Sequence, residues 1–174
     1  MALVGLLPMI FMNIPLGGFF IFYEVSLYFS IIWGLFFYAC FKTHQVKLKT
    51  TLNVFFLTQL CVFVAWDLLG LPKVNPFYAF TDVAFPLNIL GYVFGVGLTE
   101  ELGKMIPLLI ILRNAKEPLI PQTMVFYGLM AGISFGVFEG VQYQMTVNAE
   151  QTYDVSFFLN IARLTSLPFL HACW

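Results

Sequence analysis

Two adjacent glutamates and a lysine stand in the middle of a long apolar segment of this chain. They are Glu100, Glu101 and Lys104, and the surrounding residues 84–112 are otherwise mostly apolar. Glu100 and Lys104 are four residues apart, so a helix places them on one face, where they could form an ion pair. A carboxyl group held beside a second carboxylate can accept or release a proton near neutral pH. The cluster is therefore a candidate for general acid–base chemistry rather than for a structural ion pair alone.

Three more ionisable residues lie in later apolar segments. Glu139 lies one segment further along the chain, and Arg163 and His171 lie in the segment after that. Counting from the segment ends at about 1.5 Å per residue puts Glu139 and Arg163 at a similar depth, so Glu139 could simply pair with Arg163. The same count puts His171 at the depth of Glu100. Histidines in membranes often only form hydrogen bonds between helices, but the shared depth makes His171 a candidate for the same site.

The composition makes these charges conspicuous. The chain has 174 residues, of which 60% are hydrophobic and only 10% are charged, whereas soluble domains carry about 25% charged residues. A charge inside a membrane span costs roughly 2.5–3.5 kcal/mol on insertion scales, so each one calls for a reason. The net charge of −1 shows none of the basic surface of nucleic-acid-binding proteins, so no nucleic-acid partner is expected.

Long apolar segments predict an all-α fold, a polytopic bundle of transmembrane helices in the lipid bilayer. Each segment approaches or exceeds the ~20 residues that cross the hydrocarbon core, and helices are the spanning form compatible with such unbroken runs. We expect a single transmembrane domain over residues 1–174, with about five to six helices. Residues 1–16 form an uncertain first helix, and the expected spans are residues 18–41, 51–71, 84–112, 119–144 and 155–174. Because the last span ends inside an apolar run, we expect the sequence to be truncated at its C-terminus.

The connections between these segments predict an orientation. Residues 42–49 contain three lysines, and residues 113–116 contain an arginine and a lysine. Residues 72–83 contain one lysine, and residues 145–154 contain no basic residue. The positive-inside rule therefore places the first two connections in the cytoplasm and the other two outside.

Small residues recur at every fourth position on two of the expected spans. One stripe precedes Lys104 and the other surrounds Glu139; their members are Gly91, Gly95, Thr99 and Gly103, and Gly128, Gly132, Gly136 and Gly140. Such stripes let helix backbones approach closely. If the two stripes faced each other in antiparallel helices, Glu100 and Glu139 would point to opposite sides. We therefore expect each stripe to pack on a different helix and to flank a polar cavity.

Three motifs, in order along the chain, resemble those of the PrsW-type intramembrane proteases. Residues 100–104, Glu-Glu-Leu-Gly-Lys, are similar to the E-E-x-x-K motif of that family, and residues 135–139, Phe-Gly-Val-Phe-Glu, to its F-x-x-x-E motif. Residues 163–174, with Pro168 and His171, are similar to its Arg…Pro…His segment. The family belongs to a superfamily with the CAAX-processing membrane endopeptidases and the APH-1 scaffold subunit. The resemblance covers about residues 94–174.

The resemblance implies a hydrolase, an intramembrane protease that cleaves single-pass membrane proteins such as anti-sigma factors in a bacterial-type cytoplasmic membrane. Neither a Ser/His/Asp constellation nor the zinc motif H-E-x-x-H is evident, so a water molecule activated by a glutamate is the expected nucleophile. We assign Glu100 as the general base, with Glu101 tuning it or holding the water. His171 would orient the water or donate to the oxyanion, and Glu139 would be a second acid–base or site-shaping carboxylate. The supporting residues are Lys104, Phe135 and Arg163.

Zinc is the less favoured alternative, and no cofactor is expected. Catalytic zinc sites use three protein ligands, whereas His171 is the sole histidine in a predicted span. The cysteines, Cys40, Cys61 and Cys173, are far apart, and we expect them to be small buried residues rather than metal ligands or a disulfide.

Two other function classes stay open at this stage. The chain could be a catalytically silent membrane scaffold, although a scaffold does not need a pair of charged carboxylates. It could also be a proton- or ion-coupled transporter, since intramembrane carboxylates are common in transporters, but no inverted repeat is evident. The sequence does not indicate the oligomeric state.

Overall fold

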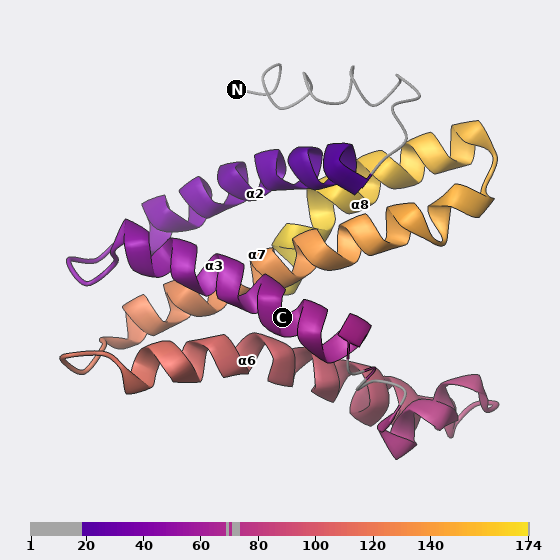
Figure 1. Ribbon diagram of the computed structural model, residues 1–174, viewed down its shortest axis with the longest axis horizontal. Helices are drawn as coiled ribbons and strands as arrows, with labels where there is room; N and C mark the ends of the chain where they lie inside the picture. Colours follow the sequence, from indigo (N-terminus) through magenta and orange to yellow (C-terminus); the bar gives the residue numbers. More distant parts are fainter. Residues whose placement is uncertain (1–18, 69, 71–73, 174) are drawn as a thin grey trace.

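The computed structural model describes residues 19–68, 70 and 74–173, and these residues form helices and turns without a β-strand (Figure 1). The long helices are α2 (Phe19–Phe41), α3 (Leu48–Phe63), α6 (Leu98–Arg113), α7 (Pro121–Met145) and α8 (Tyr153–Cys173). Shorter elements join them: the π-helical turn η1 (Val64–Leu68), the 3₁₀ helix η2 (Pro76–Asp82), α5 (Asn88–Leu90), the π-helical η3 (Gly91–Gly97) and the 3₁₀ turn η4 (Asn148–Glu150). The predicted all-α membrane bundle is confirmed.

Three of the described helical stretches are long and apolar enough to cross a membrane. They are Ile21–Phe41, Leu48–Trp66 and Pro121–Glu150. The other two long stretches, α5–η3–α6 and α8, carry the ionisable residues singled out above except Glu139, which lies on α7. Their crossing of the membrane stays a prediction. The uncertain helix at residues 1–16 and the last residue of the fifth expected span, Trp174, lie outside the described residues.

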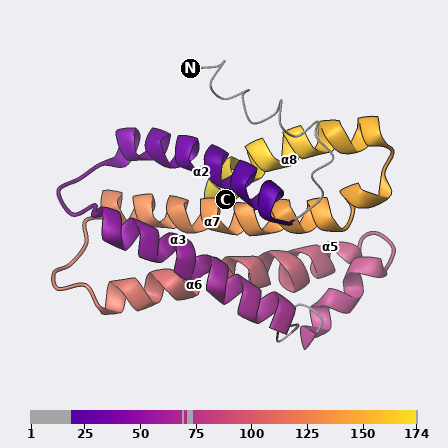
Figure 2. The same ribbon diagram turned by 45° about the horizontal axis from the view of Figure 1, so that its top comes forward.

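Helix α7 is the centre of the bundle. It packs against α2, α3, α6 and α8, and it runs between α2 and α8 on one side and α6 on the other (Figure 2). Its side chains Phe126, Ile133 and Val137 are fully or almost fully buried. The outer helices instead expose large apolar side chains such as Ile31 and Phe158, which suits lipid rather than water as the surrounding medium.

The small-residue stripes hold different elements at backbone distance. A Cβ atom at Gly136 would lie 2.6 Å from the carbonyl oxygen of Leu167 on α8, and one at Gly95 would lie 2.8 Å from the backbone of Tyr78 on η2. The expectation that each stripe packs on a separate partner is therefore confirmed. Gly128 is the exception, because a Cβ there would contact no described residue within 4 Å.

Gly136 and Gly128 give a matched test of this packing. We expect Gly136→Ala to destabilise the protein by about 1–3 kcal/mol, because α7 and α8 must separate to admit the methyl group. Gly128→Ala adds the same methyl group to open space on the same helix, and alanine is the better helix former. Thermal unfolding in detergent should show a lower midpoint for the first variant only. Equal midpoints would mean that close contact between α7 and α8 is not required.

The two basic connections lie at the same end of the bundle (Figure 1). The Thr43 hydroxyl is 2.6 Å from the Thr123 hydroxyl. The Gln45 side chain donates to the carbonyl of Pro118 (3.1 Å) and accepts from the backbone N–H of Ile120 (2.8 Å). The turn between α7 and α8 and the helix η2 lie at the opposite end. This alternation is the one that the charge distribution predicts.

Which end faces the cytoplasm can be tested by cysteine labelling. The native cysteines would first be replaced by serine. We expect Lys47→Cys in intact cells to resist a membrane-impermeant maleimide, and Glu150→Cys at the other end to react with it. Strong labelling at position 47 with none at position 150 would invert the orientation.

The cysteines depart from expectation. Cys40 and Cys173 are exposed and Cys61 is half-buried, and all three are free. The expectation that they are buried is wrong, because an apolar thiol on the outside of a membrane bundle is solvated by lipid and does not need the protein core.

Candidate active site

Three helices bring the predicted site residues to one cavity of about 550 Å³. Helix α6 contributes Glu100, Glu101 and Lys104, α7 contributes Glu139, and α8 contributes Arg163 and His171. Residues from segments about 70 positions apart in the chain therefore share one space. The seventh predicted residue, Phe135, is not part of the lining and packs behind it.

Glu139 and His171 are hydrogen-bonded to each other through Oε2 and Nε2. Both side chains are mostly buried, with 19% and 14% of their surface exposed. The ring of Phe135 lies 4.9 Å from the His171 ring, centroid to centroid. The imidazole is therefore held on one side by a carboxylate and on another by an aromatic face.

The alternative pairing of Glu139 with Arg163 is not what the structure shows. Arg163 instead donates to the Asn148 Oδ1 at 2.9 Å and lies over the Tyr143 ring at 4.2 Å. The reason is the direction of the side chains, which lean towards the N-terminus of their own helix. In the antiparallel α7 and α8, this turns Glu139 and His171 towards each other and turns Arg163 away towards the helix connection.

The structural alternative for the other cluster, an ion pair between Glu100 and Lys104, is not observed either. Lys104 Nζ donates to Glu101 Oε1 at 2.6 Å, and the Lys104 side chain is only 7% exposed. The same ammonium group lies 5.1 Å from the centroid of the Phe135 ring, at cation–π distance. Within the described part of the chain, Glu100 forms no ion pair, so its carboxylate is not engaged by a cation.

Phe135 packs behind the cavity and contacts residues from two of the helices that line it. It is almost fully buried and contacts Lys104 and His171, which come from two different helices. A third neighbour is Trp66 of η1, whose ring centroid lies 5.8 Å away. Phe135 therefore fixes the relative positions of Lys104 and His171.

A second cavity of about 720 Å³ adjoins the first. Glu100, Glu139 and Tyr143 line both cavities. The second one extends to the end of the bundle near η2 and is lined there by polar side chains, among them Tyr78, Asp82, Gln142 and Thr146. The first one instead includes Gly97, Leu167 and Leu170 between α6 and α8. Glu100 and Glu139 therefore lie at the boundary between the polar second cavity and the more apolar first cavity.

Two residues at the site have weak or no sequence signals. Tyr143 lies four residues after Glu139, so the helical period indicates that it shares the face of that glutamate, but its position between both cavities comes only from the fold. Trp66 belongs to no motif, and its contact with Phe135 follows from the packing of α3 and η1 beside α6 and α7.

A serine pattern in α7 has a structural role instead of a catalytic one. Residues 132–136, Gly-Ile-Ser-Phe-Gly, match G-x-S-x-G, which in α/β-hydrolases marks a nucleophile on a strand-to-helix turn. Here Ser134 lies inside a helix, is fully buried and donates to the carbonyl of Phe55 on α3. It lines neither cavity of the site.

Comparison with known proteins gives one result. The family described as PrsW family intramembrane metalloprotease matches residues 26–174, which include every site residue named above. Neither the search of curated proteins nor the search of solved structures found a match.

Proposed function

We propose, from the premise that this chain belongs to the PrsW family of intramembrane proteases, that it hydrolyses peptide bonds of single-pass membrane proteins, such as anti-sigma factors. The observation that carries the proposal is the convergence of Glu100, Glu139 and His171, from three helices, on one cavity. We also propose that this protein is a multi-pass protein of a bacterial-type cytoplasmic membrane, a location that accords with substrates of this class. A site inside the bundle reaches bonds in or beside a substrate's own span.

Glu100 is the general base in this mechanism. Its carboxylate takes a proton from a water molecule while the water oxygen attacks the carbonyl carbon of the scissile bond. The proton then passes from Glu100 to the leaving nitrogen as the C–N bond breaks, so the carboxylate is restored. Among the described residues no cation is paired with Glu100, and this supports the role, because a carboxylate paired with a lysine is a weaker base.

His171 and Glu139 act together on the opposite side of the reacting carbonyl. A ring N–H of His171 donates to the oxygen that becomes negative in the tetrahedral intermediate. Glu139 accepts a hydrogen bond from His171, and so limits the rotation of the imidazole, or it holds the attacking water. Lys104, which lines the same cavity and donates a hydrogen bond to Glu101, offsets the negative charge of the carboxylates.

The two cavities suggest separate paths for substrate and water. Helices α6 and α8 both pack on α7, and the cavity between them has the apolar side chains Leu167 and Leu170 beside the charged ones. We propose that the substrate enters here from the bilayer as an extended strand. Water reaches Glu100 and Glu139 through the polar cavity at the η2 end.

The residues of this site fit a catalytic metal poorly. A catalytic zinc needs three protein ligands, and in the described ranges no group of three or more His, Cys, Asp and Glu side chains is placed to hold a metal ion. His171 and Glu139 are hydrogen-bonded to each other, and Glu101 forms an ion pair with the buried ammonium group of Lys104, so these three side chains already have partners. A fixed positive charge at this position also repels a dication. We therefore assign no step to a metal, although the family description includes one.

Chelation tests this assignment in the assay that tests the function. We expect the complete purified protein, reconstituted in liposomes, to cleave at least one of a panel of single-pass membrane proteins. The rate should change less than twofold after treatment with a strong chelator, and elemental analysis should find far less than one zinc per chain. Loss of cleavage on chelation, restored by zinc, would make the protein a metal-dependent protease and remove Glu100 as the sole activator of water.

A further inference from the structure

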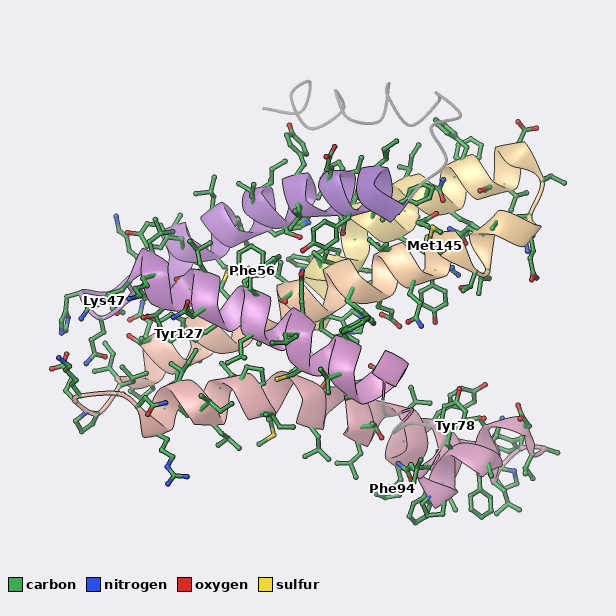
Figure 3. All side chains as sticks on the ribbon, in the orientation of Figure 1. Lys47, Phe56, Tyr78, Phe94, Tyr127 and Met145 are labelled. Atoms are coloured by element: carbon green, nitrogen blue, oxygen red, sulfur yellow. The ribbon has the colours of Figure 1, made fainter. Side chains whose placement is uncertain are left out.

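A third cavity, of about 660 Å³, lies at the end of the bundle opposite η2 and plays no part in the proposed proteolysis. It lies between α3, α6 and the start of α7. Its mouth is formed by the two basic connections, and its interior by apolar side chains of α3 and α6. Figure 3 shows Lys47 and Tyr127 together at this end, with Phe56 further along α3.

The mouth of this cavity is held by hydrogen bonds between the two connections. Gln45 is buried and bonds to Pro118 and Ile120 across the gap. The Tyr127 hydroxyl donates to the carbonyl of Gln45 and accepts from the backbone N–H of Lys47, each at 3.2 Å. The position of the Lys47 backbone is therefore fixed before any ligand binds.

The charged residues that line the cavity are Lys47, Lys116 and Glu117. In the described part of the chain none of them belongs to an ion pair. Two lysines and one glutamate leave one positive charge at the mouth. This balance is complementary to a group with a single negative charge, such as a phosphodiester.

The interior of the cavity follows one face of α3. Leu52, Phe56 and Leu60 recur every four residues along it, with Ile110 and Ile111 of α6 on the other wall. The eight helical steps from Leu52 to Leu60 span about 12 Å of helix. A cavity that is cationic at the membrane surface and apolar over this length matches a headgroup joined to a hydrocarbon chain, and not a free anion.

We propose that this cavity is a binding site for a monoanionic phospholipid, such as phosphatidylglycerol. The phosphodiester binds between Lys47 and Lys116, and one acyl chain lies along Leu52, Phe56 and Leu60. Basic pockets at the ends of transmembrane helices are suited to acidic lipid headgroups. The site is separate from Glu100, Glu139 and His171, and the proposal is independent of the proteolytic function.

Native mass spectrometry of the complete protein tests the proposal. The protein would be released from membranes of equal parts phosphatidylglycerol and phosphatidylcholine, and the retained lipid counted. We expect the wild-type protein to retain about one phosphatidylglycerol per chain. In the Lys47→Gln/Lys116→Gln variant the retained amount should fall about tenfold. The control is Lys42→Gln/Lys49→Gln, which removes the same amount of charge from the same end of the bundle at residues that do not line the cavity. This control should keep the lipid within twofold.

Two further arms separate the headgroup from the chain. Leu60→Trp narrows the apolar part without a change in charge and should also lower lipid retention. Inorganic phosphate at millimolar concentration should not displace the lipid. If the double variant fails to fold, Lys116→Gln alone, on an exposed loop, should still lower retention several-fold.

The proposal is overturned by any of three results. Equal retention of phosphatidylcholine would show no selectivity for an anionic headgroup. Equal losses in the two double variants would show general attraction to a basic surface. Displacement by inorganic phosphate would show an anion site without a role for the acyl chain.

Discussion

Glu100→Gln is expected to lower the rate of substrate cleavage by about 10²–10⁴-fold, the usual contribution of a general base. The amide keeps the size and most of the shape of the carboxylate but cannot take a proton from water. Glu100 lines both cavities and forms no ion pair among the described residues, so the substitution breaks no structural salt bridge. Accumulation of cleaved substrate in cells, normalised to protein level, measures the effect.

Glu24→Gln is the matched control for this substitution. It makes the same chemical change at an exposed carboxylate on α2, away from both cavities. Its cleavage rate should equal that of wild type. If Glu100→Gln keeps full activity at normal protein level, Glu100 is not the base, and Glu101→Gln becomes the variant to measure.

The contact between Glu139 and His171 predicts that these residues act as one unit. We expect Glu139→Ala and His171→Ala each to lower cleavage by about 10²–10³-fold, the loss seen when an oxyanion donor is removed. The double variant should be no slower than the slower single variant, because either substitution already removes the pair. Thermal unfolding of each variant separates loss of activity from loss of fold.

A double-mutant cycle of Glu139 with Arg163 provides the contrasting case. Arg163 and Glu139 line the same cavity, but Arg163 instead donates a hydrogen bond to Asn148 and lies over the Tyr143 ring. Glu139→Ala combined with Arg163→Ala should therefore show the product of the two separate losses. The geometry of this site would be contradicted if the rate losses of Glu139→Ala and His171→Ala multiplied in their double variant. It would also be contradicted if the losses of Glu139→Ala and Arg163→Ala did not multiply.

The helices and the residues of the site are predictable from the sequence because both depend on local rules. Apolar runs long enough to cross a bilayer indicate helices, and the structure has a long helix in each expected segment from residue 19 onwards. Charges at Glu100, Glu139 and His171 stand out because they are costly in such segments. The four-residue glycine period of α7 indicates close packing, and Gly136 lies directly on α8.

The pairing of the charges is not predictable in the same way. Depth counting places backbone positions only, whereas an ion pair depends on the direction and length of side chains. Lys104 reaches Glu101 instead of Glu100. His171 reaches Glu139 from a backbone position beside Gly132, which is about two helical turns from Glu139. Trp66 lies beside Phe135 only through packing between distant segments. The contacts of His171 with Glu139 and of Trp66 with Phe135 each join two separate elements and leave no trace in a single segment. The pair of Lys104 and Glu101 lies within α6 at a spacing of three residues, which a helix permits as readily as the spacing of four between Glu100 and Lys104.

The most direct test of the proposed site is the identification of cleavage products made by the purified protein. The complete wild-type protein and its Glu100→Gln variant would be reconstituted with a single-pass substrate in liposomes, and the new termini would be determined by mass spectrometry. We predict that wild type yields paired fragments with termini in or beside the substrate's membrane span, and that Glu100→Gln yields almost none. The same fragments at equal rates from both proteins, or none from wild type with any substrate of the panel, would contradict the proposal.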